Sequence, residues 1–131
     1  MNDENSKNTL EQILKKFKIL LNIIEMQECD DVQFAREQLS RDIETIYEVF
    51  EENISRTDYD EILHLVKRNY NRMYQARGGL TEFYIWRVDF YDRVKANEPL
   101  SRVKDELKVI FDKVNWWVPS QDIVLWFNDL Y

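Results

Sequence analysis

A glutamate and a histidine three positions apart have the spacing of a helical metal-binding pair. Glu61 and His64 match the Glu-x-x-His pattern that places two ligands on one face of a helix in carboxylate-bridged di-iron bundles. Those centres use the pair twice and add two further glutamates, whereas His64 is the only histidine of this chain. On a helical wheel both side chains point away from the apolar stripe of their own helix, towards solvent. We therefore interpret His64 as a surface histidine and predict no metal ion and no cofactor.

The chain has one cysteine, Cys29, as its only candidate thiol nucleophile. A catalytic thiol needs a base and an orienting group beside it, and the neighbouring Glu28, Asp30 and Asp31 disfavour the thiolate. The sequence also lacks a glycine-rich phosphate loop, a serine nucleophile elbow and a Cys/His ligand cluster. We therefore predict that the protein is not an enzyme. Because one cysteine cannot form an internal disulfide, a reducing, cytoplasmic compartment is favoured.

Acidic side chains are concentrated in the first half of the chain. The net charge is −7, and the stretch from Glu25 to Glu61 holds 13 acidic and 3 basic residues, which gives a local charge of −10. Four carboxylates gather on the outer face of one predicted helix: Glu37, Glu44, Glu48 and Glu51. This face is either an ordinary solvated surface or a recognition surface that steers a basic protein partner. It would repel a phosphate backbone, so we expect no nucleic-acid partner.

Basic side chains follow this acidic stretch. Lys67, Arg68, Arg72 and Arg77 occur with no acidic residue between Ile62 and Leu80, and two tyrosines lie among them. A nucleic-acid site would have to be built from these four charges on an otherwise acidic protein. We interpret them instead as counter-charges for the neighbouring acidic helix.

Aromatic residues crowd the segment 81–96. If Phe83, Trp86 and Phe90 face the core at helical spacing, other large side chains of the segment must point elsewhere. Tyrosine is a favoured anchor of protein interfaces, because its large rigid ring is buried at little entropic cost. The alternatives are that the whole segment packs into the core, or that Tyr84 and Tyr91 anchor a partner.

The elements that must position these residues are helices. Only 2 glycines and 2 prolines occur in 131 residues, far below the ordinary usage of about 7% and 5%. We predict helices over 9–28, 32–53, 58–75, 81–96 and from Pro99 to about Val114, and a last helix that Ser120 caps. A short strand over 83–86 is the alternative to the start of the fourth helix.

The predicted fold is all-α, a single compact bundle of five or six helices with largely antiparallel neighbours. Residues 1–8 are expected to form a flexible tail and residues 9–131 one domain. No apolar run reaches the roughly 18 residues that a membrane span needs, so no membrane partner is expected. The first helix has apolar residues on both faces, including Ile19, Ile23 and Met26, so it is either central in the bundle or carries an exposed patch.

One part of the chain resembles a known family. Residues 77–85 read RGGLTEFYI, residues 97–100 read NEPL and residues 104–107 read KDEL. These stretches, within 77–111, resemble the C-terminal half of small bacterial immunity proteins of polymorphic and contact-dependent growth inhibition toxin systems. The resemblance implies a cytosolic protein that binds its cognate toxin domain and blocks the active site or the substrate surface. These families are diverse in their inhibitory residues, so the resemblance assigns no functional position.

The acidic surface fits such a role independently, because many toxin domains are basic nucleases. We therefore predict an immunity protein in which Glu37, Glu44, Glu48 and Glu51 steer a basic toxin domain while Tyr84 and Tyr91 anchor it. The alternative is a scaffold or regulatory adaptor that acts through helix-mediated self-association or partner binding.

Overall fold

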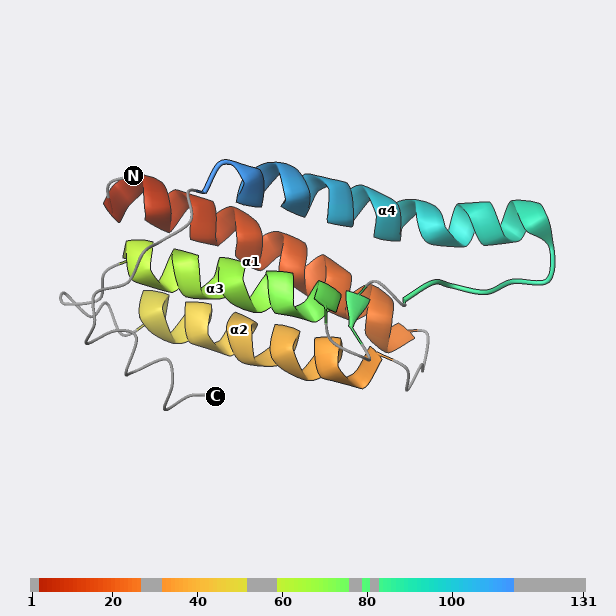
Figure 1. The fold of residues 1–131 in the computed structure, drawn as a ribbon, viewed down its shortest axis with the longest axis horizontal. Coiled ribbons are helices and arrows are strands. Elements are labelled where there is room, and N and C mark those ends of the chain that lie inside the picture. The colour runs from red at the N-terminus through yellow and green to blue at the C-terminus, as the bar shows by residue number, and fades with distance from the viewer. Residues whose placement is uncertain (1–2, 27–31, 52–58, 76–78, 81–82, 115–131) are drawn as a thin grey trace.

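Four α-helices form the part of the chain that the computed structural model describes, which comprises residues 3–26, 32–51, 59–75, 79–80 and 83–114. They are α1 (Asp3–Met26), α2 (Gln33–Glu51), α3 (Tyr59–Gln75) and α4 (Phe90–Asp112). Successive helices run in opposite directions, with α1 between α4 and the pair formed by α2 and α3 (Figure 1). The all-α prediction is confirmed, but these ranges contain four helices instead of five or six.

The α1 helix is central because its apolar residues face three other helices. Its side chains fill the core at the helical period, and five of them are fully buried: Leu10, Ile13, Phe17, Leu20 and Ile24. Phe17 stacks on Tyr70 of α3 at a centroid distance of 5.8 Å, and Tyr70 stacks on Phe111 of α4 at 4.8 Å. The central position predicted for this helix is confirmed. Its second apolar face is nevertheless open at Ile19 and Met26, which are exposed.

The N-terminal helix begins earlier than the sequence indicated. We predicted a flexible tail over 1–8 and a helix start at Thr9, but α1 is helical from Asp3. The Ser6 side chain is fully buried and donates a hydrogen bond from Oγ to Oδ1 of Asp60 at 3.1 Å. This contact joins the first turns of α1 to the start of α3, which explains why residues 3–8 are part of the bundle.

The α4 helix is continuous where a break was predicted. Asn97-Glu98-Pro99 was interpreted as the start of a fifth helix, yet Pro99 lies inside α4. Proline at this position removes the hydrogen bond to the carbonyl of Lys95, and Lys95 is exposed, so water can satisfy that carbonyl. The same buried face continues on both sides of Pro99, through Asn97, Leu100 and Val103. The predicted break between a helix ending at residue 96 and another beginning at Pro99 is therefore wrong, because both positions belong to α4.

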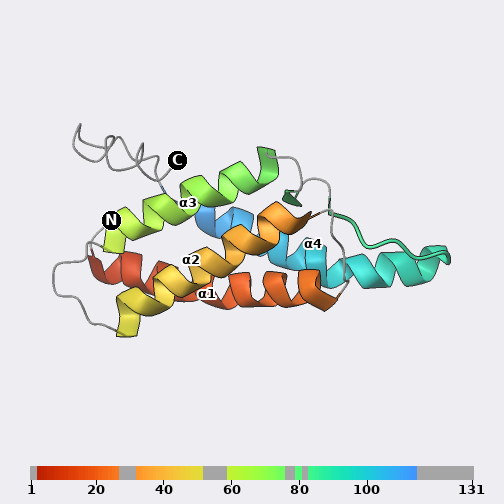
Figure 2. The ribbon, with the colours of Figure 1, turned by 90° about the horizontal axis from the view of Figure 1, so that it is seen from below.

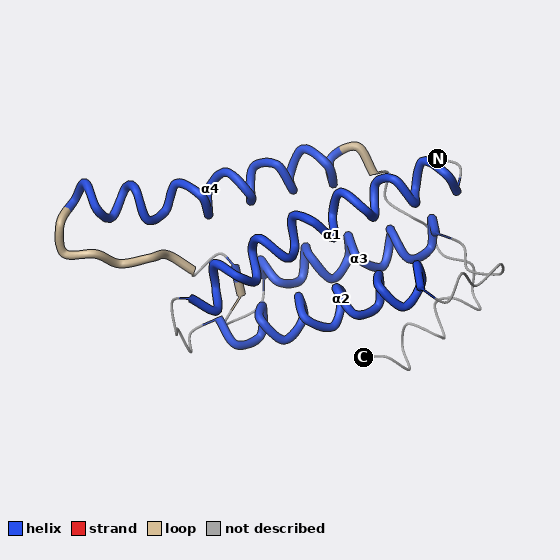
Figure 3. The backbone as a smooth tube through the Cα atoms, turned by 180° about the vertical axis from the view of Figure 1, so that it is seen from behind, coloured by secondary structure: helices blue, strands red, loops and turns tan. Residues whose placement is uncertain are grey.

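Residues 83–87 are extended and Val88 and Asp89 form a bend, so 83–89 is not helical, as Figure 3 shows in the loop that leads into α4. Buried and exposed side chains alternate here: Phe83 and Ile85 are buried, whereas Tyr84 and Trp86 are exposed. This alternation has the period of two of an extended chain. The helix predicted over 81–96 is wrong for this stretch, and the alternative extended conformation is closer, although 83–87 is not part of a strand.

Two predicted features lie outside the described residues: the cysteine, Cys29, and the last helix that Ser120 caps. None of the helices in the described ranges combines the length with the apolar character needed to cross a membrane.

Candidate interaction surface

The loop before α4 and the first turns of that helix project beyond the ends of the other three helices (Figures 1 and 2). We call residues 84–95 the projecting arm. It carries six exposed large apolar side chains within eleven positions: Tyr84, Trp86, Val88, Phe90, Tyr91 and Val94. Tyr91 is 77% exposed and Val88 is 93% exposed. A cluster of exposed apolar residues this dense on a small protein typically marks an interaction site.

The base of the arm is fixed by one side chain. Asn97 of α4 accepts a hydrogen bond from the backbone N–H of Ile85 at 2.9 Å and donates one to the carbonyl of Ile85 at 2.8 Å. The Asn97 amide also donates to the carbonyl of Arg93, and its side chain is buried. Asn97 therefore pairs with Ile85 as a neighbouring strand would. It satisfies the backbone of a buried residue that has no strand beside it among the described residues.

Two further contacts hold the chain at this base. Lys104 donates from Nζ to the carbonyl of Leu80 at 2.9 Å, and the N–H of Phe83 donates to the same carbonyl at 3.2 Å. With Leu80, Phe83 and Ile85 all buried, the extended segment is packed along α4 before it turns outward. The arm thus begins from a fixed position.

Asp89 turns the chain from the loop into α4. Its Oδ1 accepts hydrogen bonds from the N–H groups of Tyr91 at 2.8 Å and Asp92 at 3.4 Å, as an N-cap residue does. Asp92 adds negative charge to the first turn, where the helix dipole favours it. The spacing of Asp89 and Asp92 is a helix-start signal in the sequence, whereas the predicted helix began at Thr81.

Charged side chains are interleaved with the aromatic ones. The Arg93 guanidinium lies 4.5 Å from the ring centroid of Trp86 and 5.6 Å from that of Phe90. These cation–π contacts hold the two exposed rings beside one another. Phe90 and Tyr91 also meet edge to face at 5.7 Å. These contacts link Trp86, Phe90 and Tyr91 on the arm.

The two predicted anchors, Tyr84 and Tyr91, are both exposed on the arm. The prediction that Trp86 and Phe90 face the core is wrong, since they are 64% and 60% exposed. It failed because helical spacing was assumed across a segment that is extended up to Asp89. Ile85, expected to point away from the core, is buried for the same reason.

The predicted acidic row lies on α2, where all four of its members are exposed: Glu37, Glu44, Glu48 and Glu51. Glu37 accepts a hydrogen bond from Gln33 at 3.1 Å. Within the described ranges none of these carboxylates forms an ion pair, so the arginines of α3 do not neutralise them. The helix that carries the row, α2, lies on the opposite side of α1 from α4 (Figure 1). The structure therefore does not bring the acidic row and the aromatic anchors into one patch.

A carboxylate that the prediction did not single out is buried between α2 and α3. Oδ1 of Asp42 accepts hydrogen bonds from Gln38 at 3.1 Å and from Asn69 at 3.0 Å. The second oxygen, Oδ2, is buried and has no hydrogen-bond partner in the described part of the chain. Burial raises the pKa of Asp42 from 3.8 to about 7, against the lowering effect of its two hydrogen bonds and of nearby Arg41.

The metal-pair residues are not arranged as expected. Glu61 is exposed, but His64 is largely covered: its side chain is 11% exposed and its Nδ1 lies 2.7 Å from the carbonyl oxygen of Asp60. The prediction of a solvent-facing histidine is wrong because the ring folds back on the first turn of α3. No group of three metal-ligating side chains occurs in the described part of the chain.

The basic residues of α3 are divided between core and surface. Lys67 is buried and donates from Nζ to the carbonyl of Val114, so it ties α3 to the end of α4. Arg68 is exposed and Arg72 is half-buried, while Arg77 lies outside the described residues.

Comparison with known proteins assigns no relative to this chain. No protein-family model, no curated protein and no solved structure matches it.

Proposed function

We propose that the protein is a non-catalytic binding protein that neutralises a toxin domain in the cytosol and docks on it through the projecting arm. The observation that carries this proposal is the exposure of six large apolar side chains on one protruding segment. Burying such a patch against a partner removes apolar area from water, which stabilises a complex by roughly 25 cal/mol per Å² before the costs of association.

The composition of the arm suits a protein interface. Trp, Tyr and Arg are the residue types most often found among the energetically dominant contacts of interfaces. The arm holds Trp86, Tyr91 and Arg93, and the Arg93 guanidinium lies 4.5 Å from the centroid of the Trp86 ring. The expected partner has an apolar cleft in which the projecting arm binds.

The fixed base of the arm supports tight binding. Asn97 holds Ile85 at both backbone polar groups, and Asp89 caps the helix that carries Phe90 and Tyr91. A surface that is ordered before binding loses less conformational entropy in the complex.

The acidic row of α2 supports a basic partner. Because its four glutamates are exposed and form no ion pair with a described residue, their field extends into solvent. Electrostatic steering acts through this field on the approaching molecule. The row therefore orients a basic toxin domain during approach, although the docking contacts are made by the arm.

The toxin-neutralising role itself rests on the resemblance to immunity proteins. Residues 77–111, which carry that resemblance, include the whole arm together with Leu80, Asn97 and Lys104 at its base. In this proposal the arm covers the toxin's active site or its substrate-binding surface.

The test begins with affinity purification from the native host. The wild-type protein is compared with Trp86→Ser/Tyr91→Ser, which removes two arm contacts, and with Ile19→Ser/Met26→Ser, a matched change of exposed apolar residues on α1. We expect one basic partner that the arm variant loses and the α1 variant keeps. Expression of that partner alone should stop growth, and co-expression of the wild-type protein should restore it. A partner that is harmless alone would contradict the neutralising role.

A scaffold or adaptor role is the second candidate, because Ile19 and Met26 are exposed on α1. Light scattering of the purified protein separates the two. A stable dimer that Ile19→Ser/Met26→Ser converts to monomer would favour the scaffold, whereas a monomer would favour the first proposal.

A further inference from the structure

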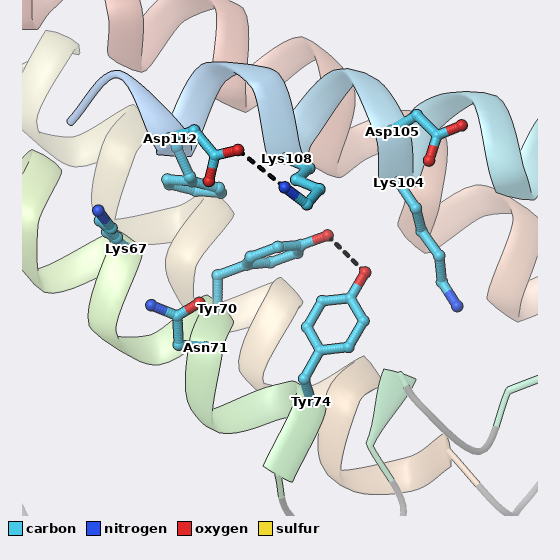
Figure 4. Close-up of a pocket in the computed structure, with 9 residues that line it drawn as sticks. Lys67, Tyr70, Asn71, Tyr74, Lys104, Asp105, Lys108 and Asp112 are labelled. Carbon is cyan, nitrogen blue, oxygen red and sulfur yellow. Dashed lines mark hydrogen bonds and ion pairs between the residues drawn. The ribbon is translucent and has the colours of Figure 1, made fainter.

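A cleft of about 450 Å³ lies between α3 and α4 (Figure 4). It is lined by Lys67, Tyr70, Asn71 and Tyr74 from α3, and by Lys104, Asp105, Lys108, Phe111 and Asp112 from α4. This volume is within the range of roughly 300–1,000 Å³ that is typical of small-molecule sites. The cleft therefore has room for a compact organic molecule.

Aromatic rings form the floor and one wall of this cleft. Tyr70 stacks on Phe111 at 4.8 Å, and Tyr74 meets Tyr70 edge to face at 5.2 Å. The hydroxyl oxygens of the two tyrosines are 3.0 Å apart. Burial raises the pKa of both hydroxyls, so both remain protonated. Flat apolar walls with two neutral hydroxyls suit a planar ring that carries polar groups at its edge.

Positive charge exceeds negative charge around the cleft. Lys108 and Asp112 form an ion pair at 2.9 Å and neutralise one another. The carboxylate of Asp105 points away from the tyrosine pair, whereas the ammonium of Lys104 lies beside Tyr74 (Figure 4). Lys67 adds a further cation at the other end of the cleft, where its Nζ donates a hydrogen bond to the carbonyl of Val114.

Lys104 is the cation best placed to meet a ligand. Its Nζ donates to the carbonyl of Leu80 and lies 5.8 Å from the Tyr74 ring centroid, and in the described ranges it forms no ion pair with a carboxylate. Burial without such a partner lowers the pKa of its ammonium group. An anion in the cleft would supply the missing negative charge and form a charge-assisted hydrogen bond.

We propose that this cleft binds a small aromatic anion, a planar ring that carries one carboxylate or phosphate group. The ring packs against Tyr74 and the edge of the Tyr70–Phe111 stack, and the anionic group pairs with Lys104. This site lies outside residues 84–95 and does not rest on the proposed toxin partner, although its Lys104 also contacts Leu80 at the base of the arm.

The test is a titration of the whole protein, followed by NMR of its tyrosine ring signals. Benzoate and phenyl phosphate are the anionic probes, and benzamide is the neutral probe of the same shape. We expect saturable shifts at Tyr70 and Tyr74, with benzamide weaker by about tenfold or more. The tighter of the two anions identifies the acidic group. Equal binding of benzamide, or no saturable shift at these two tyrosines, overturns the proposal.

Variants assign the charge to one residue. Lys104→Gln should weaken benzoate about tenfold and bring it close to benzamide, while Lys104→Arg should restore most of the difference. Lys15→Gln, at an exposed position of α1, is the matched control and should bind benzoate as the wild type does. If circular dichroism shows that Lys104→Gln does not fold, the comparison of benzoate with benzamide on the wild-type protein still tests whether the cleft prefers an anion. Unchanged benzoate affinity in folded Lys104→Gln would contradict the proposal.

Discussion

Asn97 contacts both backbone polar groups of Ile85, accepting from its N–H at 2.9 Å and donating to its carbonyl at 2.8 Å. One side chain of α4 thus forms the two backbone hydrogen bonds that a neighbouring strand would form in a sheet. The contact explains how an aromatic arm can project from a helical bundle and still begin at a fixed point.

Replacing Asn97 by alanine should loosen the arm. The change removes the partners of a buried N–H and a buried carbonyl, so the free energy of unfolding should fall by about 1–3 kcal/mol. Asn22→Ala is the matched control, because Asn22 is exposed on α1 and should cost much less. Urea denaturation measures both variants, and hydrogen exchange should show faster exchange at the Ile85 amide in Asn97→Ala. Equal stabilities of the two variants would refute the role given to Asn97.

Much of the bundle was predictable because apolar residues in α1 to α3 follow the helical period. Leu10, Ile13, Phe17 and Leu20 recur at helical spacing within the helix predicted over 9–28, and all four are buried. Periodicity failed around Asn97-Glu98-Pro99, where a local helix-start signal is overridden by a buried face that continues through Leu100. It also failed at Ser6, whose burial depends on Asp60, 54 positions away in the chain.

The candidate surface was predictable only in part, for a related reason. Exposure of the α2 glutamates followed from helical periodicity, whereas exposure of Tyr84 and Tyr91 was one of two alternatives for their segment. Exposure of Trp86 and Phe90 did not, because large aromatic residues usually lie in the core. Their positions depend on the length of α4 beyond the bundle, which local sequence does not encode.

Truncation of the two phenylalanines at the ends of the loop should change the free energy of unfolding by very different amounts. Phe83 is 4% exposed at the base of the arm, whereas Phe90 is 60% exposed on it. Phe83→Ala should therefore lower the free energy of unfolding by about 3 kcal/mol or more, and Phe90→Ala by less than about 1 kcal/mol. Thermal and urea denaturation of the two variants provide the comparison. A large loss in Phe90→Ala would mean that the arm packs on the protein itself and does not offer a docking surface.

Reversing charge on α2 should slow capture of a basic partner. With Glu44→Lys/Glu48→Lys the association rate should fall by about tenfold at low salt, and its dependence on ionic strength should flatten, because the attractive field is reduced. The dissociation rate should change little, since the row is not placed at the arm. Stopped-flow or surface-based kinetics with the partner from the purification measure both rates.

The control for this experiment changes the net charge equally at other sites. Glu11→Lys/Glu61→Lys reverses two exposed carboxylates on α1 and α3. If it slows association as much as the α2 variant, net charge alone explains the effect and the acidic row has no special part.

Asp42 should make the stability of the bundle depend on pH. Its pKa is raised from 3.8 to about 7 in the folded protein, so between these values the folded state binds a proton that the unfolded state has lost. The contribution of Asp42 to the free energy of unfolding is therefore greatest below about pH 4, falls as the pH rises towards 7 and is constant above that. The total loss is on the order of 4 kcal/mol, at 1.36 kcal/mol for each unit of pKa difference.

Asp42→Asn isolates this contribution, because the amide keeps an oxygen for Gln38 and Asn69 but cannot ionise. At about pH 8 the variant should be more stable than the wild type, and near pH 4 the advantage should disappear, since the wild-type carboxyl is then protonated in the folded state. Other carboxyl groups contribute equally to both proteins, so the difference between their urea-denaturation curves reports Asp42 alone. Glu44→Gln, at an exposed site on the same helix, should follow the wild type. A difference between Asp42→Asn and the wild type that stays constant with pH would show that the buried carboxyl does not titrate in this range.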